Sequence, residues 1–271
     1  MNLVLFDTSQ RKLLYPFTLT RPVADIRVGI FTIREFWERY FQLTSFTITE
    51  QYLQEKFPNT TTNTVILVNS SLLPNEEFFS LLIELKDDEA IVDGENVLAA
   101  KTSSYNNWQV DDIQLEKFST HKRVGSADYL LYPWQIFQLN DAAIKYDYDV
   151  ITMGRTSASV SPTNHLINPD KIFAEEGAKL QHAILNAEKG PIYIGKNCEI
   201  MEGSIIRGPF AMLDGSVVKM GTKIYGATVL GPKCVAGGEI KNSIMVGYSN
   251  KAHDGYLGDS VIGEWCNIVA G

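Results

Sequence analysis

The sequence predicts two domains, an N-terminal α/β domain followed by a left-handed parallel β-helix built from hexapeptide repeats. Three observations predict this fold: a strict six-residue apolar period, small residues at a fixed offset within it, and alternating strand-like and helix-like segments before it. A six-residue period suits a triangular solenoid, in which three short strands make one coil and coils stack at about 4.8 Å. We place the α/β domain at residues 1–153, a polar, turn-rich linker at 154–171 and the β-helix at 172–271.

The hexapeptide repeat is clearest from residue 194 onward. Steps of six residues from there fall only on apolar side chains, namely Ile194, Ile200, Ile206, Met212, Val218, Ile224, Leu230 and Ala236. Four residues further on, the side chains are small with one exception, and they are Cys198, Ser204, Phe210, Ser216, Thr222, Thr228 and Cys234. We expect the aliphatic residues to fill the interior and the small residues to turn inward near the corners. The tight corners are expected to use the unusual φ angles of glycine, at Gly195, Gly231, Gly237 and Gly263.

The three cysteines all fall on the inward small position of the repeat. Cys198, Cys234 and Cys266 form no C-x-x-C pair, so the sequence favours neither a disulfide nor a metal site. We therefore predict three packed, slowly reacting thiols and assign no side chain as a metal ligand.

The repeat fails between Ala236 and Leu257 and then resumes through Ile262 and Ile268. Because local rules tend to fail at functional positions, we expect a functional site in or beside this stretch. The chain stops at Gly271 in mid-coil, and solenoids need a terminal cap. We expect either that the β-helix is incomplete at its C-terminus or that another subunit covers the last coil.

The first 153 residues read as alternating strands and helices. Leu3–Phe6 and Thr64–Val68 are apolar, strand-like runs, and residues 90–92 and 97–100 flank a predicted hairpin turn. A first helix should bury Ile30, Ile33, Trp37, Tyr40 and Phe41, and a second should begin at an Asn75 cap and bury Phe78, Leu81, Leu82 and Leu85. This alternation favours a partly parallel sheet.

Charge and hydropathy exclude several classes of protein. The formal net charge is −8, which argues against a general nucleic-acid binder because such proteins usually present a basic face. No apolar run is long enough to span a membrane, and the N-terminus lacks a signal-peptide pattern. We expect a cytoplasmic protein with no membrane partner, and an acidic total charge still allows a local basic pocket for a phosphorylated metabolite.

The segments 251–259 and 262–268 resemble the acetyltransferase motif of the bifunctional enzymes that synthesise UDP-N-acetylglucosamine. Those enzymes pair an N-terminal uridylyltransferase domain with a C-terminal hexapeptide acetyltransferase. The whole chain is similar to a divergent branch of this family found in Bacteroidetes-type bacteria, through residues 19–22, 26–30 and 132–134 as well. The resemblance implies a nucleotidyltransferase-like N-terminal domain.

The resemblance also implies roles for individual residues. It makes His253 the general base that takes a proton from the amino group of glucosamine 1-phosphate while that nitrogen attacks acetyl-CoA, the co-substrate. Tyr256 and Asn267 match positions that contact the sugar phosphate or the reacting acyl group. Lys241 matches a phosphate-binding lysine, and Lys223 falls where the family uses an arginine, whose bidentate fork an ammonium lacks.

In the N-terminal domain the family's glycine-rich phosphate loop is missing. Arg11 falls about where the loop arginine is expected, and Arg21 and Arg27 are candidates to supply further positive charge to a nucleotide triphosphate. Asn69 stands where the family has a Mg²⁺-binding aspartate, a change that would weaken Mg²⁺ binding.

The resemblance thus implies a sugar-nucleotide enzyme with two reactions. The N-terminal domain would transfer UMP from UTP to N-acetylglucosamine 1-phosphate with Mg²⁺, and the β-helix would acetylate glucosamine 1-phosphate. Two alternatives stay open: a binding or regulatory protein that has lost catalysis and uses its β-helix to oligomerise, and a sugar nucleotidyltransferase with another base or sugar specificity. We expect a homotrimer, since hexapeptide acyltransferases form their acyl-CoA clefts between neighbouring β-helices.

Overall fold

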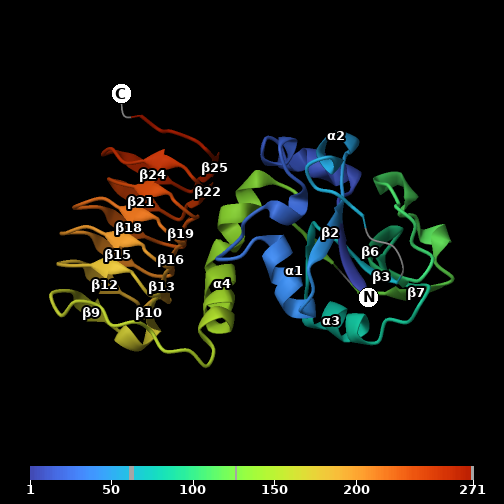
Figure 1. The fold of residues 1–271 in the computed structure, drawn as a ribbon, viewed down its shortest axis with the longest axis horizontal. Coiled ribbons are helices and arrows are strands. Elements are labelled where there is room, and N and C mark those ends of the chain that lie inside the picture. Colours follow the sequence, from blue (N-terminus) through green and yellow to red (C-terminus); the bar gives the residue numbers. More distant parts are fainter. Residues whose placement is uncertain (61–63, 126, 270–271) are drawn as a thin grey trace. The chain divides into compact units, whose positions relative to one another are not determined.

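The computed structural model describes residues 1–60, 64–125 and 127–269 (Figure 1). The chain divides into two compact units. The N-terminal unit comprises Met1–Ile26 and Thr32–Tyr132, and the C-terminal unit comprises Arg27–Phe31 and Pro133–Gly271. The domain bounds expected from the sequence differ from these, because the helix before residue 153 groups with the β-helix.

The N-terminal unit is built on a mixed sheet in the order β2-β1-β3-β6-β5-β7. Its strands are β1 (Asn2–Phe6), β2 (Ser45–Ile48), β3 (Val65–Asn69), β5 (Glu89–Asp93), β6 (Asn96–Thr102) and β7 (Thr120–Arg123). β1 pairs in parallel with β2 and β3, whereas β6 runs antiparallel to β3 and β5. The partly parallel sheet and the β5–β6 hairpin are therefore confirmed. A short pair, β4 (Leu72–Leu73) and β8 (Asp128–Tyr129), lies outside the main sheet.

Helices of this unit are α1 (Ile33–Phe41), α2 (Gln51–Gln54) and α3 (Glu76–Ile83), together with the short 3₁₀ turns Ser9–Leu14, Phe17–Leu19, Val23–Asp25, Val110–Asp112 and Leu115–Lys117. The predicted cap of α3 is confirmed, because the Asn75 side chain accepts a hydrogen bond from the Phe78 amide. The prediction for the first helix was partly wrong. Thr32 and Glu35 form a capping box that starts α1 after Ile30, and Tyr40 faces solvent.

The C-terminal unit contains a parallel β-helix of the left-handed hexapeptide type, made of three sheets. The sheets contain the strands β10-β13-β16-β19-β22-β25, β11-β14-β17-β20-β23 and β24-β21-β18-β15-β12-β9. The strands in chain order are β9 (His165–Ile167), β10 (Ile172–Ala174), β11 (Lys179–Leu180), β12 (Ile184–Asn186), β13 (Ile192–Ile194), β14 (Glu199–Ile200), β15 (Ile205–Arg207), β16 (Phe210–Met212), β17 (Val217–Val218), β18 (Lys223–Tyr225), β19 (Thr228–Leu230), β20 (Val235–Ala236), β21 (Glu239–Lys241), β22 (Ile244–Gly247), β23 (Asn250–Lys251), β24 (Tyr256–Gly258) and β25 (Val261–Glu264). The predicted fold class is confirmed.

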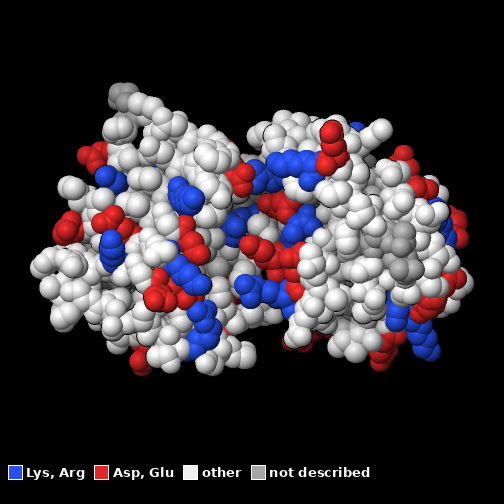
Figure 2. Space-filling view, viewed as in Figure 1, with Lys and Arg blue, Asp and Glu red and all other residues white. Residues whose placement is uncertain are grey.

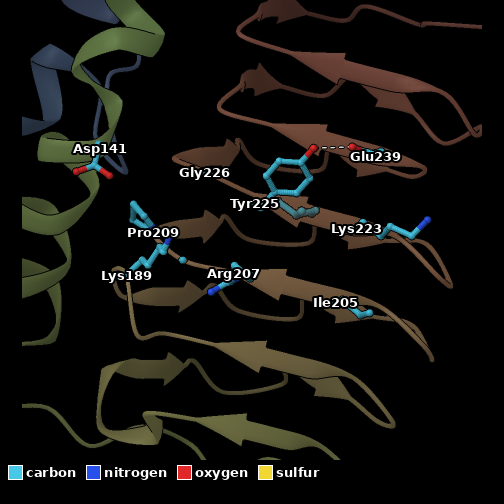
Figure 3. Close-up of a pocket in the computed structure, with 11 residues that line it drawn as sticks. Asp141, Lys189, Ile205, Arg207, Pro209, Lys223, Tyr225, Gly226 and Glu239 are labelled. Carbon is cyan, nitrogen blue, oxygen red and sulfur yellow. Dashed lines mark hydrogen bonds between the residues drawn. The ribbon is translucent and has the colours of Figure 1, made fainter.

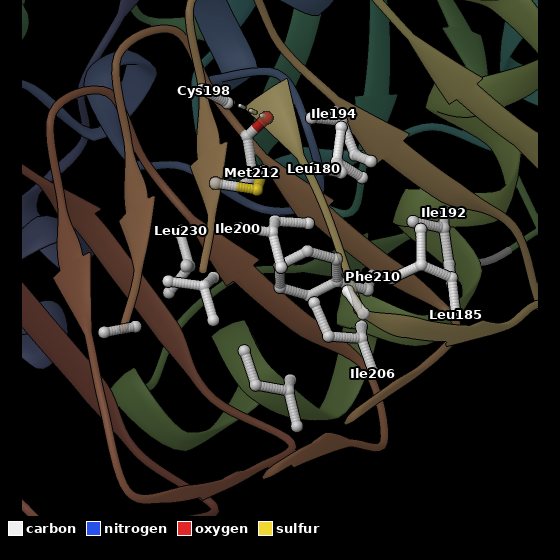
Figure 4. Packing of buried hydrophobic residues seen from close by; sticks show 14 of the residues in the cluster. Leu180, Leu185, Ile192, Ile194, Cys198, Ile200, Ile206, Phe210, Met212 and Leu230 are labelled. Atoms are coloured by element: carbon white, nitrogen blue, oxygen red, sulfur yellow. Dashed lines mark hydrogen bonds between the residues drawn. The ribbon is translucent and has the colours of Figure 1, made fainter. Parts of the chain in front are cut away.

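The interior of the β-helix follows the predicted repeat (Figure 4). Both sets of predicted inward positions, from residue 194 to residue 236, are buried. In the regular coils each residue pairs with the one 18 positions later, as Phe210 does with Thr228 and Val217 with Val235. Three hexapeptides thus make one coil, and the aliphatic column fills its centre.

The break in the repeat proves to be a shortening of the coil. Val229 pairs with Ile244 and Val235 with Asn250, which are 15 positions apart instead of 18. The stacking nevertheless stays parallel and in register. The connections at the corners are therefore shorter in these coils, whereas the strands are retained.

Two predictions about the solenoid were wrong. Gly195, Gly231, Gly237 and Gly263 are not among the glycines with positive φ. At Gly231 the glycine is needed for close approach instead, because a Cβ there would lie 1.9 Å from the Val246 carbonyl oxygen. Cys266 is exposed, unlike Cys198 and Cys234, since no described coil stacks on the outer side of its own coil.

Helix α4 (Pro133–Thr152) was not predicted from the sequence. Its buried polar residues bind segment 27–31 to the β-helix. Asn140 donates to the Ala227 carbonyl oxygen at 2.7 Å and accepts from the Gly29 amide at 3.1 Å, and Asp147 accepts from the amides of Ile30 and Phe31. The predicted linker at 154–171 also contains β9, the first strand of its sheet. Among the described residues, no helix has the length and apolar character needed to cross a membrane.

Candidate functional site

The outward side of the sheet β24-β21-β18-β15-β12-β9, called the outer face below, carries several of the predicted site residues. Lys223 pairs with Glu239, and Glu239 pairs with Tyr256 on the next coil. In the neighbouring column Tyr225 pairs with Lys241, and Lys241 with Gly258. Since adjacent parallel strands lie about 4.8 Å apart, the predicted Lys223, Lys241 and Tyr256 are brought together on one surface.

Polar contacts order this surface. The Tyr225 hydroxyl donates to Glu239 Oε1 at 2.5 Å, and this bond to a carboxylate raises the pKa of Tyr225 to about 12. The Tyr256 ring lies along its own strand, because a Cβ placed on Gly258 would fall 2.1 Å from Tyr256 Oη. The absence of a side chain at Gly258 therefore leaves the space that the exposed Tyr256 ring occupies on the outer face.

A pocket of about 790 Å³ opens beside strands β15, β18 and β21 of the outer face and is bordered by Asp141 of α4 (Figure 3). The cations that line it are Lys189, Arg207 and Lys223, and the acids are Asp141 and Glu239. Both acids are already engaged, Asp141 by Lys145 and Glu239 by Tyr225. Within the described chain, the three cations make no hydrogen bond or ion pair, so the pocket can accept an anion.

The other predicted residues of the β-helix lie at its corners. His253 is exposed in the bend between β23 and β24, and its ring makes no hydrogen bond to any described residue. Asn267 is exposed and bridges to Asn250 of the coil before it. The Lys241 Nζ atom lies 3.9 Å from Asp259 Oδ2. None of the roles assigned to these residues is tested by this geometry, and they stay predictions.

In the N-terminal unit, Arg11 is a core residue. Its Nε donates to Asp7 Oδ2 at 3.1 Å, its Nη2 donates to the Thr18 carbonyl oxygen, and only 1 % of the residue is exposed. Asp7 also accepts from Thr49 Oγ1 and the Val23 amide. Burial outweighs these favourable contacts and raises the pKa of Asp7 to about 6. The guanidinium of Arg11 is thus used by the fold, and its assignment to a phosphate stays a prediction.

Arg21 and Arg27 are placed in different units. Arg21 is partly buried in the N-terminal unit, and its carbonyl oxygen accepts from Arg11. Arg27 is buried in the C-terminal unit, where it donates to the Ile30 carbonyl oxygen. Their expected contacts with a triphosphate stay predictions.

A second pocket, of about 270 Å³, lies at the carboxyl end of β1, where open α/β sheets usually bind ligands. It is lined by Phe6, Asp7, Thr8 and Ser9 and by residues 95–97, 110, 111, 113 and 114. Thr8 Oγ1 is buried and has no hydrogen-bond partner among the described residues. An unpaired buried hydroxyl at a pocket wall is a place for a ligand acceptor or donor.

The same edge of the sheet does not offer a good Mg²⁺ site. Asn69 ends β3, but it is buried and its side-chain oxygen accepts from the Ser71 amide at 2.9 Å. Asp7 is committed to Arg11, Thr49 and Val23 as described above. Among the described residues, no group of three or more His, Cys, Asp or Glu side chains is arranged to hold a metal. These residues therefore do not fit a metal held by protein ligands.

Several residues of the outer face were not predicted from the sequence. Arg207, Tyr225 and Glu239 lie on it, yet they follow no local motif and become neighbours only when coils stack. The signal that could have found them is the outward position immediately before or after each inward aliphatic residue, as in Ile206–Arg207, Ile224–Tyr225 and Glu239–Ile240, compared across coils. The visible side of the β-helix otherwise mixes basic and acidic side chains, without the continuous basic surface that a nucleic acid needs (Figure 2).

Comparison with known proteins gives two kinds of match. Residues 3–156 match a family model described as sugar nucleotidyl transferase. The Bifunctional protein GlmU of Rippkaea orientalis is 30 % identical over 127 residues, which cover 39 % of this chain and 28 % of the relative. That of Thermus thermophilus is 28 % identical over 144 residues, 44 % of this chain and 30 % of the relative. The match thus spans less than a third of the length of these relatives.

Proposed function

We propose, from the premise that this chain belongs to the sugar nucleotidyl transferase family, that its β-helix binds an amino-sugar 1-phosphate and acetylates it with acetyl-CoA. The observation that carries this proposal is the outer face, where Lys223, Lys241 and Tyr256 come together on three neighbouring strands. The GlmU relatives are named as bifunctional proteins, which agrees with a second activity outside the nucleotidyl transferase region.

The phosphate would bind the ammonium groups of the outer face. Lys223 makes no ion pair within the described chain, and Lys241 has only a distant carboxylate at 3.9 Å. Charge-assisted hydrogen bonds from such groups are about twice as strong as neutral ones. Glu239 accepts only the Tyr225 hydroxyl in the described structure and can also accept from a sugar hydroxyl or an amine.

The proposed acetyl transfer uses His253, which lies in the exposed bend just before β24 of this sheet. The substrate nitrogen attacks the thioester carbonyl carbon of acetyl-CoA, His253 takes the proton that the nitrogen loses, and the CoA thiolate leaves. A phenol such as Tyr256 or an amide such as Asn267 can donate a hydrogen bond to the oxyanion that develops. The product is an N-acetylated sugar 1-phosphate.

Acetyl transfer is tested by following free CoA thiol with glucosamine 1-phosphate and acetyl-CoA. His253→Ala should lower kcat at least about 10²-fold, the lower end for loss of a general base. His165→Ala is the matched control, because His165 is an exposed histidine on β9, at the opposite end of the outer-face sheet from β24. Equal rates for wild type and His253→Ala would remove His253 from the mechanism.

The second candidate function is nucleotidyl transfer by the N-terminal unit, which the family match over residues 3–156 favours. The nucleotide would enter the pocket at the end of β1, where Thr8 offers an unpaired hydroxyl. UTP and N-acetylglucosamine 1-phosphate, with and without Mg²⁺, should give UDP-N-acetylglucosamine and pyrophosphate. Thr8→Val should raise the KM for UTP, and no product from wild type under either condition would favour the binding-protein alternative.

The β-helix is also proposed to assemble as a trimer. Two isoleucines, Ile184 and Ile205, are exposed on the outer face, at 38 % and 42 %. Flat sheets with exposed aliphatic side chains tend to associate. Light scattering should give three times the chain mass, and a monomer at tens of micromolar protein would contradict this.

A further inference from the structure

Lys251 occupies an interior position of the β-helix that is aliphatic in earlier coils. Register pairing places it directly after Ala236 in the column that also contains Val218, Ile200 and Leu180. All of these are buried, and Lys251 is only 5 % exposed. A lysine here is a departure from the repeat, because burying an ammonium is costly unless it is hydrogen-bonded.

The Lys251 ammonium makes two hydrogen bonds to backbone carbonyls. Its Nζ donates to the Gly237 oxygen at 3.0 Å and to the His253 oxygen at 2.7 Å. Among the described residues, no other donor reaches either carbonyl. Through these two hydrogen bonds, Lys251 connects the bend that contains His253 to Gly237 of the preceding coil.

The bend itself, residues 252–255, lies directly on two glycines of that coil. A Cβ on Gly237 would fall 2.1 Å from the Ala252 carbonyl oxygen, and one on Gly238 would fall 3.0 Å from Asp254 Cα. The far end of the bend is held by the Glu239 amide, which donates to the Gly255 oxygen at 3.1 Å. Between these points, the Lys251 ammonium is the hydrogen-bond donor that reaches the His253 residue.

We propose that Lys251 is a positioning residue that fixes the His253 bend at the corner that leads into β24, an inference that rests on the proposed role of His253. The lysine does not touch substrate. It holds the backbone of His253 and thereby limits where the imidazole can lie. Burial also lowers the pKa of the Lys251 ammonium, although Asp254 opposes this shift, which is in keeping with a group enclosed by the protein.

The test replaces Lys251 by a residue of similar length without donors. Lys251→Met should fold, because the preceding coils carry apolar residues at this position. The amide order parameters of residues 252–255 should fall from near 0.85 toward 0.6 or below. The kcat for acetyl transfer should fall at least about 10-fold, while the KM for glucosamine 1-phosphate should stay within about 2-fold because the outer face is intact.

Controls separate positioning from a general loss of structure. Lys219→Met removes a half-buried lysine of an earlier coil whose side chain has no hydrogen bond among the described residues, and it should change neither order parameters nor kcat. Lys251→Gln keeps one short donor and should give intermediate values, so the proposal remains testable if Lys251→Met does not fold.

The outcomes also distinguish this inference from the proposed function. Unchanged order parameters at residues 252–255 in Lys251→Met and Lys251→Gln would overturn the positioning role. Lower order parameters in a protein whose wild type does not acetylate would support the positioning role and would contradict the acetyltransferase proposal alone. Equal falls in kcat and in affinity for the sugar phosphate would point to a collapsed coil and would overturn the inference.

Discussion

The arginines of the two units show opposite uses of positive charge. In the N-terminal unit, Arg11 is enclosed with Asp7 and donates to the Thr18 carbonyl. In the β-helix, Arg207 lies in a pocket beside Lys189 and Lys223, and its guanidinium makes no ion pair or hydrogen bond with any described residue. A charge that the fold has already neutralised stabilises the protein, whereas one left without a partner in a pocket can bind a ligand.

The difference also shows what sequence position alone leaves open. Arg11 sits where a phosphate-binding arginine is expected in a related enzyme, yet Asp7, four residues earlier, is aligned to engage it. Arg207 belongs to no motif, yet the stacking of coils places it in the basic pocket. Partners in space decide which arginine is available.

The largest expected effect is the contrast between Arg11→Met and Arg207→Met in stability. Removing Arg11 leaves Asp7 buried without its partner, which should lower the free energy of unfolding by about 3–5 kcal/mol. Removing the Arg207 guanidinium, which makes no ion pair or hydrogen bond with any described residue, should change it by less than about 0.5 kcal/mol. Urea unfolding of both variants measures this. Similar stabilities for the two variants would mean that Arg11 is not structural.

The next effect is the pH dependence of stability caused by Asp7. Burial raises its pKa from 3.8 to about 6, so the folded chain binds this proton more tightly than the unfolded chain. Stability should therefore fall as pH rises through this window, on the order of 1–3 kcal/mol, relative to Asp7→Asn, which cannot ionise. The opposite slope, with wild type gaining on Asp7→Asn as pH rises, would show that Arg11 outweighs burial.

A small stability effect, with a larger effect on binding, is expected for Gly258→Ala on the outer face. The added Cβ would meet the end of the Tyr256 side chain, which is exposed and can swing away. The free energy of unfolding should change by less than about 1 kcal/mol. Binding of glucosamine 1-phosphate should weaken as much as in Tyr256→Ala, measured by calorimetry. A large loss of stability would show that this surface is packed rather than open.

Sequence periodicity predicted the β-helix well because burial repeats every six residues, as it does from Ile194 to Ala236. It could not place the corners of the shortened coils, since their geometry depends on which backbone lies above, as at Gly237 under Ala252. Helix α4 was missed because its interior-facing positions include Asn140 and Asp147, polar residues that break the apolar pattern.

The candidate site was predicted only where a local motif exists. His253, Tyr256 and Asn267 lie within one short stretch and were named from it, whereas Arg207 and Glu239 come from separate coils. Lys251 was visible in the sequence, but its inward direction is known only from its pairing with Ala236. Identifying residues that act together across coils requires the pairing register of the strands, and a single sequence does not give that register.

The claim that the outer face binds a sugar phosphate is tested most directly by calorimetric titration of the intact chain with glucosamine 1-phosphate. Lys223→Gln/Lys241→Gln should raise the Kd at least about 10-fold, since each charge-assisted hydrogen bond contributes about 1.5–3 kcal/mol. Lys179→Gln/Lys196→Gln, which removes two lysines that lie outside this sheet, should leave the Kd within about 2-fold. Equal affinities for wild type and both double variants would contradict the account.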